Sequence, residues 1–211
     1  MVDSTVRGMY TVSQIWFTSF SVEGGLPLRS KPVNSVFPLA MTAVMAAALC
    51  VLGPLAIPAG PVPVSLVNLG VFLSLYLLDW KRGTLSVLVY ILLGGAGMPV
   101  FSGFTGGLGK LLGPTGGYIL GYLALALVSG WAIRASRSPL LQLLGMALGT
   151  AVLYAMGTAW FCFQTGNTPE AALGLCVFPF LPGDLVKMGV ALGVGPLLRR
   201  RLAQAGLHPE Q

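Results

Sequence analysis

Charged side chains are scarce in this sequence. Only 9% of the 211 residues are Asp, Glu, Lys or Arg, whereas 55% are hydrophobic. Soluble domains carry about 25% charged residues, so the composition indicates a membrane protein. The twelve basic residues outnumber the six acidic ones, but they stand singly or in short groups between apolar runs. This distribution does not form the basic face that nucleic-acid binding needs, and no nucleic-acid partner is expected.

Histidine and cysteine are also scarce. The single histidine, His208, lies in a polar tail, and Cys50, Cys162 and Cys176 show no C-x-x-C spacing. An odd number of cysteines without nearby histidine favours neither a zinc site nor a disulfide framework. We interpret the cysteines as small apolar residues, and we expect no metal, no cofactor and no enzymatic activity.

Long hydrophobic runs, separated by Gly, Pro and basic residues, make up most of the chain. They predict an all-α fold, an integral membrane bundle of six transmembrane helices with a glycine-rich loop on the extracellular side. The second and third runs fall short of the roughly 20 residues of a straight span, so we expect them to be tilted, packed by neighbours or partly re-entrant. The predicted helices are 36–57, 64–79, 83–98, 115–133, 139–163 and 177–198.

One membrane domain, residues 36–201, is predicted. Residues 1–35 are mixed polar and aromatic and lack the charged and apolar regions of a signal peptide. We interpret them as an N-terminal extension whose order is open, either a cytoplasmic leader or an over-long gene start. Residues 202–211 are predicted to form a polar C-terminal tail.

Basic residues are confined to alternate loops. Ten of them flank one predicted side of the bundle, Lys110 alone lies on the other side, and Lys187 lies within a helix. This positive-inside pattern predicts a multi-pass protein of the cytoplasmic membrane with both termini in the cytoplasm. The ten residues are Arg7, Arg29, Lys31, Lys81, Arg82, Arg134, Arg137, Arg199, Arg200 and Arg201.

The glycine-rich stretch "MPVFSGFTGGLGKLLGPTGGY" spans residues 98–118. It is no phosphate loop, because Leu111 follows Gly109-Lys110 where that motif needs Ser or Thr. Its interleaved apolar residues argue against a solvated linker and predict a folded loop that lies on or in the bundle. Thr115 is expected to cap the fourth helix, with Tyr118 in the first turn. Either this is only a capped helix, or the exposed N–H groups and the Tyr118 ring bind a ligand.

Three polar residues stand inside apolar runs. Asp184 and Lys187 in "FPFLPGDLVKMGVALG" are three apart, hence on one helix face, and each charge costs roughly 2.5–3.5 kcal/mol at a membrane helix centre. They form either an ion pair near the outer interface or part of a polar pocket at the outer end. Asn68 is either an interhelical hydrogen-bonding residue or a ligand contact. An acid–base pair in an intramembrane enzyme is disfavoured, because no nucleophile is evident beside it.

The sequence resembles the BioY family, the biotin-specific substrate-capture (S) component of energy-coupling-factor (ECF) vitamin transporters. The matching stretches are "PVPVSLVNLGVFL", "KRGTLSVLVYILLGGAGMPVFSGFTGGLGKLLGPTGGYILGY" and "FPFLPGDLVKMGVA". The order and spacing of "GPTGGY" and "LPGDLVK" are the most specific part of the resemblance. Residues 1–35 have no counterpart in it.

The resemblance implies a six-helix bundle in membrane lipid that holds biotin near its outer face. It also implies docking on a transmembrane coupling subunit that carries two cytoplasmic ATPases, through Ala43 and Ala47 of the small-residue ridge in the first helix. Thr105 and Ile119 depart from the family, where an amide and a basic residue occur. A capture component for another vitamin and a ligand-free assembly protein are the alternatives. The expected ligand-binding residues are Asp184, Lys187, Tyr118, Thr105, Gly106, Gly107 and Asn68.

Overall fold

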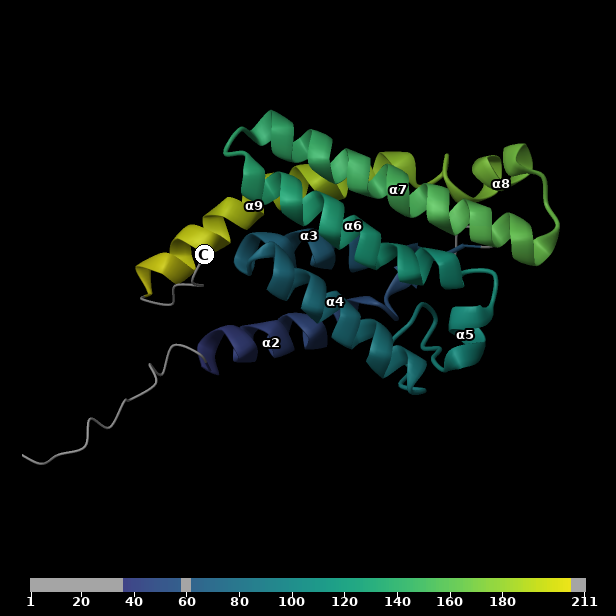
Figure 1. The fold of residues 1–211 in the computed structure, drawn as a ribbon, viewed down its shortest axis with the longest axis horizontal. Coiled ribbons are helices and arrows are strands. Elements are labelled where there is room, and N and C mark those ends of the chain that lie inside the picture. Colours follow the sequence, from purple (N-terminus) through teal and green to yellow (C-terminus); the bar gives the residue numbers. More distant parts are fainter. Residues whose placement is uncertain (1–35, 58–61, 206–211) are drawn as a thin grey trace, which may run out of the picture. The chain divides into compact units, whose positions relative to one another are not determined.

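The computed structural model describes residues 36–57 and 62–205, which are mostly helical (Figure 1). Each of the six predicted apolar runs contains a helix, so the helical fold is confirmed. The predicted extension 1–35 and residues 206–211 of the predicted tail lie outside the described residues. The helices are α2 (Val36–Leu52), α3 (Val67–Leu77), α4 (Trp80–Gly95), α5 (Leu108–Leu112), α6 (Gly116–Ala135), α7 (Pro139–Thr165), α8 (Pro169–Cys176) and α9 (Leu181–Gln204).

Three helices of the described part, α6, α7 and α9, are long and apolar enough to cross a membrane. The helices α2 and α3 are apolar but shorter, with 17 and 11 residues. At 1.5 Å per residue α3 is only about 17 Å long, roughly half a bilayer core. The expected shortness of the second helix is thus confirmed, whereas six complete spans remain a prediction.

A two-stranded antiparallel hairpin departs from the predicted all-α fold. Strand β1 (Ala56–Ile57) pairs with β2 (Val64–Ser65), where the sequence predicted the end of one helix and the start of the next. The first helix stops early because Pro54 has no N–H to donate and disfavours a helical conformation at Gly53. The chain therefore leaves α2 in extended form and returns as β2 before α3 begins.

Several predicted helix ends are also wrong. The segment before α9 was expected to be a loop, but Thr168 caps α8 by accepting from the Ala171 N–H at 3.4 Å, with Pro169 in the first turn. Helix α4 begins three residues early, because Asp79 Oδ1 accepts from the Arg82 N–H at 2.7 Å. Thr115 occupies the N-cap position of α6, but its side chain makes no capping hydrogen bond.

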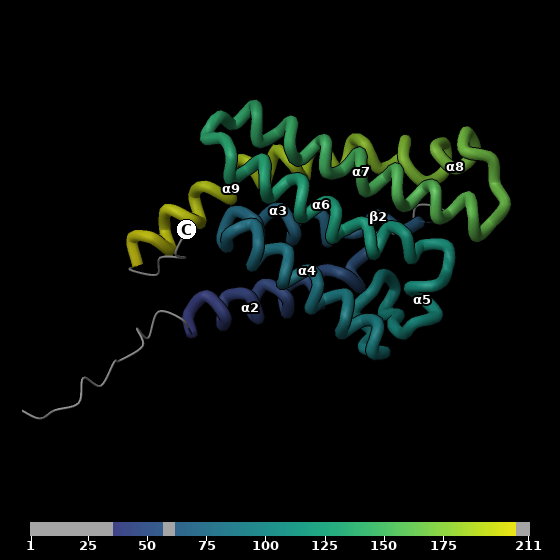
Figure 2. Tube along the Cα trace, in the orientation of Figure 1, coloured from purple at the N-terminus to yellow at the C-terminus, as the bar shows by residue number. Residues whose placement is uncertain are grey.

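Helices α6 and α7 form a close antiparallel pair, the teal and green helices of Figures 1 and 2. Glycines on both helices allow this approach, because a side chain at these positions would meet the facing helix. A Cβ at Gly149 would lie 3.1 Å from the Leu125 carbonyl oxygen and would meet Ser129, and one at Gly121 would lie 3.3 Å from Leu153. Backbone atoms cannot move aside as side chains can. These glycine contacts, the α6–α7 seam, therefore set the distance between the two helices.

We expect Gly149→Val to lower the thermal unfolding temperature of the purified protein by about 2–12 °C. Overpacking a tight contact costs roughly 1–3 kcal/mol, and one kcal/mol corresponds to about 2–4 °C in a chain of this size. The matched control is Gly189→Val in α9, where an added Cβ meets nothing within 4 Å. Equal unfolding temperatures for the two variants would show that the seam is not tightly packed.

Helices α3 and α9 run side by side in the same direction. Asn68 of α3 contacts Asp184 at the start of α9. Further along both helices, Tyr76 of α3 packs against Gly195 of α9. This parallel packing brings the first turn of α9 and the first turn of α3 together beside strand β2.

Candidate functional site

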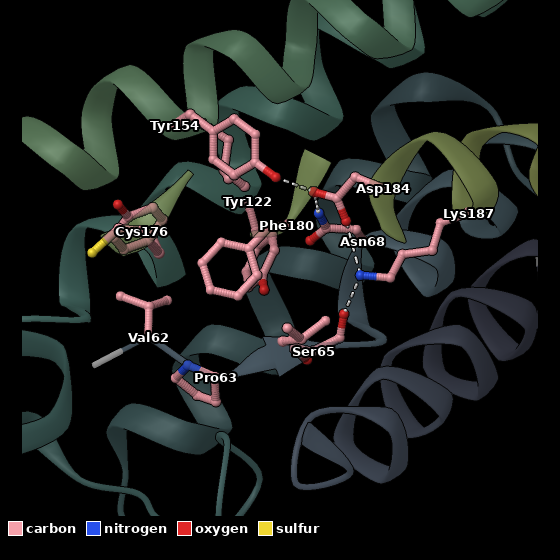
Figure 3. A pocket seen from close by; sticks show the side chains of 13 residues that line it. Val62, Pro63, Ser65, Asn68, Tyr122, Tyr154, Cys176, Phe180, Asp184 and Lys187 are labelled. Atoms are coloured by element: carbon pink, nitrogen blue, oxygen red, sulfur yellow. Dashed lines mark hydrogen bonds and ion pairs between the residues drawn. The ribbon is translucent and has the colours of Figure 1, made fainter. Parts of the chain in front are cut away.

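A small cavity lies where the first turns of α3, α6 and α9 meet α7 and the hairpin (Figure 3). Its volume is about 40 Å³. The lining combines a polar side formed by α3 and α9 with aromatic and apolar walls. The lining residues are Val62, Pro63, Val64, Ser65, Asn68, Tyr118, Tyr122, Leu153, Tyr154, Cys176, Phe180, Asp184 and Lys187.

Asp184 is the centre of the polar side. Its side chain is almost completely buried, with 3% of the residue exposed. Lys187 Nζ pairs with Asp184 Oδ1 at 2.8 Å, one helical turn away. Asn68 Nδ2 donates to Oδ2 at 3.2 Å, and the Tyr154 hydroxyl donates to the same oxygen (Figure 3). The carboxylate thus stands on α9 and accepts hydrogen bonds from side chains of α3, α7 and α9.

Lys187 connects the ion pair to the hairpin. Its Nζ also donates to the Ser65 carbonyl oxygen in β2 at 2.7 Å, and 8% of the residue is exposed. Because only Leu66 separates Ser65 from α3, this one ammonium group holds α9, the hairpin and the start of α3 together at the cavity.

The ion pair keeps some hydrogen-bonding capacity for a ligand. A carboxylate has about four lone-pair sites, and Asp184 uses three of them on Lys187, Asn68 and Tyr154. An ammonium group has three donors, and Lys187 uses two, on Asp184 and Ser65. One acceptor and one donor therefore remain side by side, which suits a ligand group that presents an N–H next to a C=O.

Aromatic rings form the walls around this polar centre. Tyr118 and Tyr122 lie one turn apart on α6 and both line the cavity with Phe180. The Tyr118 hydroxyl is engaged with Thr158 Oγ1 at 3.0 Å, so Tyr118 offers mainly its ring. Burial raises the pKa of the Cys176 thiol, which keeps it protonated and supports its interpretation as a small apolar residue.

The structure brings four of the predicted ligand-binding residues to the cavity, namely Asp184, Lys187, Tyr118 and Asn68. Thr105, Gly106 and Gly107 do not line it. Thr105 is exposed and its Oγ1 donates to the Ser102 carbonyl oxygen at 2.9 Å.

The glycine-rich loop is held on the bundle by an aromatic anchor. Phe101, 1% exposed, inserts between Gly94 and the Tyr90 ring, whose centroid lies 5.6 Å away. Gly107 N–H donates to the Gly94 carbonyl oxygen at 2.7 Å. These contacts fold the loop against α4 and away from the cavity lining, so its part in ligand binding stays a prediction.

The predicted docking residues lie on the outer face of α2. Ala43 and Ala47 are exposed, as is Ala40 one turn before Ala43, whereas Met45 and Leu49 on the opposite face are buried. The ridge thus lies open along the helix, as a docking surface requires.

Nine of the thirteen lining residues were not predicted from the sequence, and Tyr122, Tyr154 and Ser65 are the hydroxyl-bearing ones among them. Tyr122 could have been found, because it lies four residues after Tyr118 and hence on the same face of a helix. Tyr154 had no such indication, since its contact with Asp184 depends on how α7 is rotated against α9. Ser65 acts through its backbone carbonyl group, which side-chain patterns do not reveal.

Comparisons with known proteins agree with one another. The family model described as "BioY family" matches residues 27–204. The chain is 39% identical to the biotin transporter BioY of Thermotoga maritima over 154 residues, 72% of this chain and 90% of the relative. It is 34% identical to the biotin transporter BioY2 of Lactococcus lactis subsp. cremoris over 176 residues, 83% and 97% of the two chains.

A solved structure gives the same result for the fold. The crystal structure of the S-component for biotin from an ECF-type ABC transporter superimposes with a TM-score of 0.72 and 31% sequence identity. The match covers 79% of this chain and 92% of the other. Sequence and fold together establish that this chain belongs to the BioY family.

Proposed function

We propose that this chain takes up biotin across the cytoplasmic membrane as the substrate-binding subunit of an ECF-type transporter. The observation that carries the proposal is the buried Asp184–Lys187 pair, which retains one acceptor and one donor in an aromatic-walled cavity. The names of the relatives and the solved biotin S-component support the choice of ligand.

The chemistry of biotin fits the open hydrogen-bonding positions. Its ureido ring presents N–H groups directly beside a carbonyl, so Asp184 accepts from the ring and Lys187 faces the same end of the molecule. A role for Lys187 at the biotin carboxylate is less favourable, because that group lies beyond the thiophane ring and a four-carbon chain. Tyr118, Tyr122 and Phe180 enclose the apolar middle of the ligand.

Biotin binding requires the cavity to widen. A volume of about 40 Å³ holds only a few water molecules, whereas sites for small ligands typically measure roughly 300–1,000 Å³. The hairpin is the wall that can separate most easily, since the Lys187–Ser65 hydrogen bond is its link to α9. In the loaded site Thr105, Gly106 and Gly107 are assigned to the closing loop, as the family resemblance implies.

The membrane arrangement follows from the basic residues. Lys81, Arg134 and Arg200 lie near one end of the helices and mark the cytoplasmic side, while Lys110 and the cavity face outward. The six apolar helices then cross the bilayer, the short ones with the help of their neighbours, and both termini are cytoplasmic.

ATP hydrolysis is supplied by partners, because this chain carries no Walker motif. The ridge of Ala43 and Ala47 docks on the transmembrane coupling subunit, which connects to two cytoplasmic ATPases. Small residues permit the close approach of helix backbones that such docking needs.

Equilibrium binding to the detergent-purified protein tests the ligand. We expect biotin to bind, and desthiobiotin, which keeps the ureido ring, to compete. Biotin methyl ester is expected to retain most of the affinity, because the polar pair is assigned to the other end of the ligand. Displacement by thiamine or riboflavin, with no binding of biotin to folded protein, would make another vitamin the substrate and overturn the proposal.

A further inference from the structure

A second groove lies at the end of the bundle opposite the cavity. It is lined by Trp80 and Lys81 at the start of α4 and by Trp131, Arg134 and Ala135 at the end of α6, with a volume of about 420 Å³. The two helix ends are neighbours, since a Cβ at Gly130 would lie 2.9 Å from the Trp80 Cβ. Tyr122 lines the cavity and Arg134 lines the groove. They are twelve residues apart on α6, so the two sites lie about 18 Å apart along this helix.

The groove is positively charged. Lys81 and Arg134 are both exposed, and Lys81 Nζ lies 5.6 Å from the centroid of the Trp80 ring. Within residues 36–57 and 62–205, neither side chain lies within salt-bridge distance of a carboxylate. Asp79, next to Trp80 in the chain, accepts from the Arg82 N–H and is not part of the lining. The two cations are thus available to an anionic group.

An exposed apolar stripe leads away from each cation. Along α4, Leu85, Leu88 and Leu92 follow Lys81 at intervals of four, three and four residues, so all lie on one face. Along α6, Leu120 and Leu127 lie on the same face as Trp131, which is 67% exposed. Each helix therefore presents a cation at its end and a hydrophobic track at membrane depth.

We propose that this groove binds the headgroup of an anionic phospholipid such as phosphatidylglycerol. Lys81 and Arg134 pair with the phosphate, the two tryptophans lie at the interface where such rings are favoured, and acyl chains follow the leucine stripes. Charge complementarity selects an anionic lipid over phosphatidylcholine, whose choline group brings a compensating positive charge. The inference rests on the membrane location of the family and not on biotin as the ligand.

Native mass spectrometry of the purified protein with equal amounts of phosphatidylglycerol and phosphatidylcholine tests this site. The wild-type protein is expected to retain phosphatidylglycerol preferentially. In Lys81→Gln/Arg134→Gln the apparent affinity for phosphatidylglycerol should fall roughly 25-fold, about fivefold for each cation. Biotin binding should not change, which separates this site from the cavity.

The charge-matched control is Arg200→Gln/Arg201→Gln, which removes two exposed cations from the end of α9 outside the groove. It should keep the lipid preference of the wild-type protein. Equal retention of the two lipids by wild-type protein would overturn the inference. So would a loss of phosphatidylglycerol in the control as large as in the groove variant, because net charge alone would then explain binding.

Discussion

Asp184→Asn/Lys187→Met is expected to lower biotin affinity by about 100-fold or more while the protein remains folded. The double variant replaces the charged acceptor by a neutral amide and removes the open donor at the cavity, and hydrogen bonds to charged groups contribute roughly 1.5–3 kcal/mol each. Removing both charges leaves no unpaired buried ion, whereas either single change would destabilise the fold by about 3–5 kcal/mol. Calorimetric titration with biotin, together with thermal unfolding, measures both effects.

A charge-matched control is available in Lys110→Gln/Glu170→Gln. It removes one cation and one anion outside the cavity lining and should leave biotin affinity within about twofold of wild type. Biotin binding of wild-type strength in the double variant Asp184→Asn/Lys187→Met would show that the ion pair is only structural. The proposed binding site would then be wrong.

Ala43→Trp is expected to abolish biotin uptake in cells while biotin binding by the purified protein stays within about twofold of wild type. The indole ring stands on the exposed ridge of α2 and keeps the helix from approaching a partner helix closely. The cavity is lined by other elements, so its geometry is unchanged. Radiolabelled uptake and co-purification with the proposed coupling subunit are the two measurements.

Leu148→Trp on α7 is the control for bulk at an exposed position, since Leu148 is 60% exposed on a different helix. It should preserve both uptake and co-purification. Loss of both binding and uptake in Ala43→Trp would indicate misfolding. Normal uptake by this variant would show that α2 is not the docking face.

The sequence predicted the helices well and their ends less well. Six apolar runs are long and continuous, so the existence of the six main helices follows from burial in lipid or protein, whereas the short helices α5 and α8 were not predicted. The ends depend on single residues. Pro54 stops α2 and permits the hairpin, Thr168 starts a helix that the hydrophobic pattern does not mark, and Asp79 starts α4 three residues before the predicted run. The capping residues are visible in the sequence, but the predicted helix ends were placed from the hydrophobic runs alone.

The candidate site was predictable where its residues share one helix. Asp184 and Lys187 stand on one face because they are three apart, and their polar character in an apolar run distinguishes them. Tyr154 and Ser65 reach the same point from elements far away in the chain, and only the packing of α3, α7 and α9 brings them there. The glycine-rich loop was placed near the cavity by resemblance, whereas the Phe101 anchor folds it against α4.

The mutual neutralisation of Lys187 and Asp184 determines how the transport cycle responds to the membrane potential. The empty cavity has no net formal charge, because Asp184 is the only carboxylate and Lys187 the only basic side chain in its lining, and the two cancel each other. Bound biotin adds one carboxylate, so the loaded site carries a single negative charge. Moving that charge through a potential of 100 mV, negative inside, costs about 2.3 kcal/mol, whereas the empty site returns without this cost. The electrical work of uptake therefore falls on the loaded half of the cycle.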